Sequence, residues 1–174
     1  MFKKSHGVNH DGLKVKGFFR VQLLEDGKGV VGDSGWKENQ VTDLGVQNYL
    51  LTWLCSGAGG KSVAYMALGT GTQPGVADTS LNGEIFHKST NATTESRAAV
   101  SSSIIASHTA QFTAAFNSAN SFVTASANIS NVGLYQESLT SLAVNGTLFA
   151  GNTYSSSTCA TNQSVNVTYQ IRIS

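Results

Sequence analysis

Hydrophobic and polar residues alternate along much of this chain, most clearly near its two ends. Residues 165–173 alternate strictly, with one apolar face and one polar face: Val165, Val167, Tyr169, Ile171 and Ile173 against Asn166, Thr168, Gln170 and Arg172. Residues 15–24 show the same period, through Val15, Gly17, Phe19, Val21 and Leu23. A period of two with one buried face predicts β-strands of an antiparallel sheet.

The first of these strands is followed by a turn signal. Asp26-Gly27 is a dipeptide that suits a tight hairpin turn, because glycine accepts the positive φ that such turns need. Val30 and Val31 then start a short return strand that leads to Trp36. Residues 15–40 are therefore predicted to form a hairpin.

Residues 42–54 carry the one helical pattern. Thr42 or Asp43 can cap the first turn, since either side-chain oxygen can accept a free backbone N–H. Apolar side chains then recur at helical spacing, at Val46, Leu50, Trp53 and Leu54. The glycine-rich run 56–60 ends the helix, and Trp53 is expected to lie in the core.

The remaining residues, 63–174, show almost only β signals. Residues 63–68 form a short apolar run, 69–75 a loop with the single proline, and Phe112, Ala114 and Phe116 alternate. Alternation from Val123 to Ile129 resumes in the opposite phase at Val132 and Leu134, which predicts a β-bulge at Ser130-Asn131. Short strands separated by Gly, Ser and Asn clusters predict a mainly β domain, an antiparallel sandwich or jelly roll.

Length and charge refine this picture. A chain of 174 residues fits one domain, here 15–174, with residues 1–14 as a polar N-terminal arm. Charged residues make up 12%, about half the usual share, and after Arg97 only Glu137 and Arg172 carry charge. A surface poor in Lys and Glu resembles one that packs against other proteins. The net charge of +1 predicts no specific nucleic-acid partner.

Motifs for phosphate and metal binding are incomplete. Gly60-Lys61-Ser62 resembles the end of a P-loop, but Cys55 stands where that loop needs glycine. His6, His10 and Asp11 could hold a metal ion, yet no fourth ligand lies nearby in the sequence, so a solvated arm is favoured. We therefore expect no cofactor and no metal.

Catalytic groupings are also weak, which predicts that the chain is not an enzyme. His87 and His108 have no sequence-adjacent carboxylate other than Glu84, and no Gly-x-Ser-x-Gly elbow occurs. Glu84 and Glu95 could form a glycosidase pair, but nothing in their context specifies one. Trp36 could be either a core lid or an exposed contact.

The cysteines and the N-terminus indicate where the protein is made. Cys55 and Cys159 fit no zinc spacing; they could form one disulfide, although two free buried thiols are favoured. No apolar run follows the N-terminal lysines as in a signal peptide, and no apolar stretch is long enough to span a membrane. We expect synthesis in a cytoplasm and no membrane partner.

The order of several segments resembles a widespread group of small structural proteins of tailed bacteriophages. The segments are 37–45, 65–72, 78–84, 132–135, 146–150 and 167–171. The resemblance covers residues 37–174. It implies a β-rich virion protein that assembles with copies of itself and with other virion proteins, and it transfers no catalytic residues.

Three functional hypotheses follow. The first is a capsid decoration or cement protein that forms a dimer or trimer, contacts the major capsid protein and uses residues 1–14 as a tether. The second is a tail, baseplate or fibre component that binds a receptor glycan. The third is a small hydrolase in which Glu84, Glu95 or His108 converge in a cleft, and the scarcity of acids argues against it.

Overall fold

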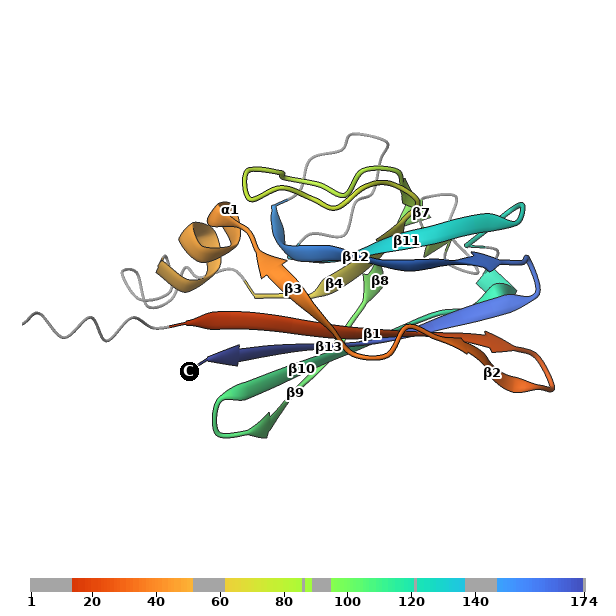
Figure 1. Ribbon diagram of the computed structural model, residues 1–174, viewed down its shortest axis with the longest axis horizontal. Helices are drawn as coiled ribbons and strands as arrows, with labels where there is room; N and C mark the ends of the chain where they lie inside the picture. The colour runs from red at the N-terminus through yellow and green to blue at the C-terminus, as the bar shows by residue number, and fades with distance from the viewer. Residues whose placement is uncertain are drawn as a thin grey trace, which may run out of the picture.

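The computed structural model describes residues 14–51, 62–85, 87–88, 95–120, 122–136 and 147–173. Within these ranges the chain is mainly antiparallel β-structure, with strands arranged in two layers (Figure 1). The lower layer, which we call sheet A, contains β1 (Val15–Glu25), β13 (Gln163–Ile173), β10 (Thr109–Phe116), β9 (Ser101–Ala106) and β2 (Gly29–Asp33). The upper layer, sheet B, contains β12 (Leu148–Cys159), β11 (Ala127–Tyr135), β4 (Tyr65–Gly69), β5 (Glu84–Ile85) and β8 (Ala98–Ala99). A separate pair joins β6 (His87–Lys88) to β7 (Glu95–Ser96).

Two segments pass from one layer to the other and join them. β3 (Lys37–Val41) pairs with β1 at one end and with β12 at the other. On the opposite side, β8 pairs with β4 while β9, which follows it directly, pairs with β10. The layers therefore form a β-sandwich whose corners are made by strands that switch sheets.

The core fills the space between the layers. Alternate residues of β1 and β13 point into it, and Phe19 lies stacked near Tyr169, with ring centroids 6.0 Å apart. From sheet B, Met66, Ile129 and Tyr154 belong to the same buried cluster. The period of two in the sequence thus gives each sheet one apolar inner face.

Sheet B is also covered on its outer side, whereas none of the described segments covers the outer side of sheet A. The loop 70–83 crosses sheet B and places Leu81 against Tyr135 and Leu148 in a second, smaller cluster. The loop is held by backbone bonds, including Asp43 N–H to the Val76 carbonyl at 3.0 Å. As a result β11 is buried on both faces from Asn131 to Tyr135.

The bulge predicted at Ser130-Asn131 is confirmed and has a structural use. The β11–β12 register shifts between Ile129 and Asn131. The shift turns the Asn131 amide toward the loop, where its Nδ2 donates to the carbonyls of Thr72 (3.2 Å) and Asn82 (3.0 Å). The alternation of the sequence does not predict which way the Asn131 side chain points, and in the structure this side chain anchors the covering loop.

The predicted mainly β class and the terminal strand are confirmed, β1 and β2 form a hairpin over residues 15–33 with β3 as a separate strand after it, and two further boundaries need correction. The strand expected to begin near Val123 begins at Ala127, because Phe122 and Val123 are buried in a bend that precedes it. The helix expected over 42–54 is α-helical only at α1 (Asp43–Gly45) and continues as a π-helix over Val46–Leu51. Residues 52–54, with Trp53, and residues 1–13 of the proposed arm 1–14 lie outside the described residues.

The start of this helix follows from local packing. Thr42 caps it as predicted, since its Oγ1 accepts the Gly45 N–H at 2.9 Å and donates to the Leu148 carbonyl at 2.6 Å. Gly45 lies directly against the Phe149 carbonyl, and a Cβ at this position would overlap that oxygen. The cap therefore also docks the helix on β12.

Candidate functional site

The outer face of sheet A is a regular surface that the other described elements leave uncovered (Figure 1). It carries the outward residues of four neighbouring strands, which are mostly neutral and polar on the β9, β10 and β13 side. The register sets them in rows: Thr109 beside Arg172, Gln111 beside Gln170, Thr113 beside Thr168 and Ala115 beside Asn166. Such a face can take part in recognition without the cost of stripping water from many charges.

Side chains on this face are held in a hydrogen-bonded row. Gln170 Nε2 donates to Gln111 Oε1 at 3.1 Å, and Arg172 donates to Gln170 Oε1 at 3.1 Å. The Arg172 guanidinium lies over the Phe18 ring, 4.7 Å from its centroid. Because these contacts fix several rotamers in advance, a partner that docks here has less side-chain freedom to remove.

Charge is concentrated at the β1–β2 end of the same sheet. Arg20 and Asp33 form an ion pair across the hairpin, and Gln22 also donates to the Asp33 carboxylate at 3.2 Å. The hydrogen bond from Arg20, helped by the Gly35 N–H, holds the pKa of Asp33 well below its ordinary value. The pair is solvent-exposed, so it orders the hairpin more than it stabilises the fold.

The opposite end of sheet A is an uncharged edge. β9 is the terminal strand of the sheet, and all six of its residues, Ser101–Ala106, are exposed. Ile104 is 84% exposed and Ile105 48%. These isoleucines are the most unusual surface residues of the described chain, because large apolar side chains seldom stand free on an edge strand.

One ionisable cluster is buried, and it is structural in form. Arg97 holds Glu84 through two bonds, Nε to Oε1 at 2.6 Å and an Nη to Oε2 at 3.0 Å, with both side chains almost fully buried. The guanidinium stacks on the Tyr135 ring, and the Tyr135 hydroxyl accepts the Leu81 N–H at 2.7 Å. Burial, followed by the Glu84 charge, raises the pKa of Tyr135 far above its ordinary value. The cluster ties β5, β8 and the covering loop together.

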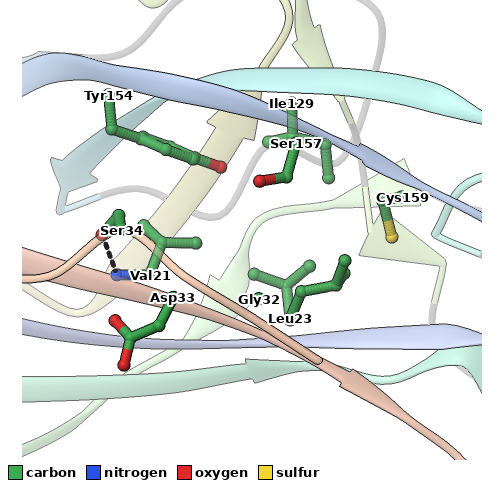
Figure 2. Close-up of a pocket in the computed structure, with 10 residues that line it drawn as sticks. Val21, Leu23, Gly32, Asp33, Ser34, Ile129, Tyr154, Ser157 and Cys159 are labelled. Atoms are coloured by element: carbon green, nitrogen blue, oxygen red, sulfur yellow. Dashed lines mark hydrogen bonds between the residues drawn. The ribbon is translucent and has the colours of Figure 1, made fainter. Parts of the chain in front are cut away.

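The gap between the sheets holds a small pocket (Figure 2). It is lined by Val21, Leu23, Tyr154, Ser157 and Cys159, among others, and its water-accessible volume is about 10 Å³. That is room for about one water molecule and no organic ligand. Cys159 is free and buried here, as favoured from the sequence, and burial raises the pKa of its thiol to about 11. Cys55 lies outside the described residues.

The structure separates the residues that the hydrolase hypothesis needed. Glu84 is committed to Arg97, whereas His108 is exposed in the turn between β9 and β10 of the other sheet. His87 and Glu95 lie on the paired strands β6 and β7, where only the backbone is described. Trp36 was expected to be either a core lid or an exposed contact. It is 45% exposed, so its side chain is accessible and does not form a core lid. His6, His10, Asp11 and Lys61 lie outside the described residues.

The sequence did not single out Arg97, Tyr135 or Ile104. A signal existed for Arg97, because an isolated charge that precedes a long uncharged stretch is a candidate for burial in a pair. Ile104 and Ile105 gave no such signal, since an apolar pair in a strand ordinarily suggests the core.

Two searches of the described residues gave negative results. No group of three or more His, Cys, Asp or Glu side chains there could hold a metal ion. No helix in the described ranges is long and apolar enough to cross a membrane.

Comparison with known proteins gives no relative: no protein-family model, no curated protein and no solved structure matches this chain.

Proposed function

We propose that this chain is a structural protein of a tailed-phage particle, and specifically a capsid decoration or cement protein. On this proposal it binds copies of itself and the major capsid protein, and it is located in the virion. It acts through protein–protein contacts and not through catalysis, cofactors, membranes or specific nucleic-acid recognition.

The observation that carries the proposal is the uncovered, nearly uncharged side of sheet A. Between Arg97 and Glu137 the sequence has no Asp, Glu, Lys or Arg, and this stretch supplies β9 and β10. Protein interfaces are depleted in Lys, Glu and Asp. A surface that lacks them over two adjacent strands, beside an edge strand with exposed isoleucines, has the composition of a contact surface.

The sandwich is consistent with this role because the pocket described between its sheets offers no room for a substrate. The pocket between the sheets holds about 10 Å³. Glu84, one of the acids named in the hydrolase hypothesis, is neutralised by Arg97 and shielded by Tyr135. A carboxylate held in this way is a poor general acid or base, because its proton has no path to a substrate.

A second candidate, a tail, baseplate or fibre component that binds glycans, is favoured by Trp36. This residue lies between β2 and β3 with nearly half of its side-chain surface exposed. Exposed indole rings are suited to stacking on apolar faces of ligands. On this alternative, Trp36→Ala would abolish binding to immobilised host glycans.

Immunogold electron microscopy tests the proposal directly. Antibody raised against the purified chain is applied to particles from the culture in which the chain is made. Gold spread over the heads supports a decoration protein, and gold confined to the tail or its tip supports the second candidate. Gold on no intact or opened particle overturns both virion roles.

A further inference from the structure

We infer that two copies of this chain associate through β9, edge to edge and antiparallel, so that the two copies of sheet A join into one continuous sheet. One side of β9 pairs with β10. No described residue pairs with the other side, although the strand runs for six residues. Its outward N–H and C=O groups are therefore available to another strand.

β9 carries few of the features that protect natural edge strands. Lys, Glu and Pro are absent from its sequence Ser-Ser-Ser-Ile-Ile-Ala. One protective device is present, a register shift that leaves Ile105 as an extra residue opposite β10. The shift lies at one end of the strand, so Ser101–Ile104 retain regular pairing geometry.

The other free strand of sheet A, β2, is better protected. It also carries exposed valines, Val30 and Val31, but it ends at Asp33 in the ion pair with Arg20. A copy placed against β2 would meet this ion pair and the neighbouring Lys28 at the strand ends, whereas a copy placed against β9 meets no Asp, Glu, Lys or Arg on the strand. Pairing of β9 with a copy of itself therefore requires no charged group on the strand to lose water.

The face on which Ile104 lies indicates the register. Ile104 is paired with Ala110, and Ala110 with Ile171, which is buried, so all three belong to the core-facing side of sheet A. A two-fold axis at Ile104 sets this residue opposite its own copy and removes both side chains from water. Ser103 then lies opposite Ile105 of the copy and Ser102 opposite Ala106, so the contact includes the residues of the register shift. Apolar cross-strand pairs of this kind stabilise antiparallel sheets, and a two-fold contact closes after two copies.

The contact between the two β9 strands buries little surface, which limits its affinity. A strand pair of five or six residues buries less than the ~1,200 Å² of a stable interface, so the isolated dimer is weak. On a particle that holds many copies side by side, each β9–β9 contact is strengthened by the other contacts that the same two copies make with the particle. The inference deepens the proposed role and rests on it for this biological meaning.

Sedimentation of the purified full chain, from micromolar to low millimolar concentration, tests the inference. We expect a reversible monomer–dimer equilibrium. Ile104→Lys should weaken dimerisation by about tenfold or more, because the axis brings two lysines together. Val30→Lys is the matched control: it adds the same charge to an exposed β-strand residue of the same sheet and should leave the equilibrium unchanged. Circular dichroism should show both variants folded.

A disulfide test checks the register. In a Cys55→Ser background, Ile104→Cys should give a covalent dimer under mild oxidation, while Val30→Cys should not, and Cys159 is buried. A wild-type chain that stays monomeric, a dimer unaffected by Ile104→Lys, or one weakened equally by Val30→Lys would overturn the inference. Self-association is measured without particles, so its failure leaves the gold-labelling result, and hence the proposed function, standing on its own.

Discussion

Replacing Glu84 by Gln should destabilise this protein more than any change on its charged surface. The variant keeps the size and shape of the side chain and removes only the negative charge. Arg97 then loses the carboxylate that it holds through two hydrogen bonds, of 2.6 and 3.0 Å, while its side chain stays fully buried and its guanidinium lies 3.3 Å from the centre of the Tyr135 ring. The aromatic face offsets part of the lost attraction but cannot replace two charged hydrogen bonds.

The expected magnitude follows from that geometry. Breaking a buried ion pair by removing one partner costs ~3–5 kcal/mol, because the other charge is left desolvated. For a domain of this size, such a loss lowers the melting temperature by about 6–20 °C. By contrast, Glu84→Leu combined with Arg97→Met removes both charges and should cost less than Glu84→Gln alone.

Urea unfolding followed by circular dichroism is the appropriate assay. The midpoint should fall while the slope stays constant, which shows that stability and not compactness has changed. Glu25→Gln is the control, since Glu25 pairs with Lys28 at the surface, and its midpoint should not move. A loss below ~1 kcal/mol for Glu84→Gln, or a double variant as unstable as the sum of its single variants, would refute the reasoning.

Three further predictions concern buried groups. Tyr135→Phe removes the acceptor of the Leu81 N–H and should cost ~1–3 kcal/mol in the same assay, and a cost near zero would contradict the bond. Phe19→Ala should cost ~3–5 kcal/mol, because Phe19 is fully buried between two tyrosines, and a cost below ~1 kcal/mol would remove it from the core. In a Cys55→Ser background, thiolate absorbance should show Cys159 ionising at a pKa of about 11. Its folded pKa exceeds the ordinary value of 9.0, so its contribution to stability is complete below pH 9 and decreases as pH rises toward 11; a thiol that titrates near pH 9 would contradict its burial.

Strands that alternate strictly could be predicted from sequence because each has one buried face. β1 and β13 pair along their whole length, from Val15 opposite Ile173 to Glu25 opposite Gln163. Their alternation therefore survives unchanged in the structure. The bulge in β11 could be predicted for the same reason, since an extra residue reverses the phase of a pattern that is otherwise regular.

Elements that depend on tertiary packing could not be predicted in this way. The alternation from Val123 to Ala127 has the spacing of a strand, but Val123 reaches the core from a bend. The π-helical turn over Val46–Leu51 follows the docking of Thr42 and Gly45 on β12, about a hundred residues away in sequence. Local patterns contain no information about such distant partners.

The candidate surface was partly visible in the sequence, and its most informative residues were not. Low charge after Arg97 suggested an interaction surface, yet it did not say which strand forms it. Ile104 and Ile105 become significant only when the sheet order places β9 at an edge and the second layer leaves it uncovered. The same two residues on β11 would be ordinary core residues, because β11 is buried on both faces.

The asymmetry between the two layers is the feature that connects fold to function. Sheet B uses its outer face for the loop 70–83, which is anchored by Asn131 and by the buried cluster around Arg97. Sheet A has no such cover among the described residues, and its polar rows are already ordered by contacts such as Gln111 to Gln170. A bare sheet whose free edge carries few protective features invites association with another strand. If sheet A is the contact surface that we propose, the covered layer provides the stability and the uncovered layer provides the rigid, ordered side chains for the contact.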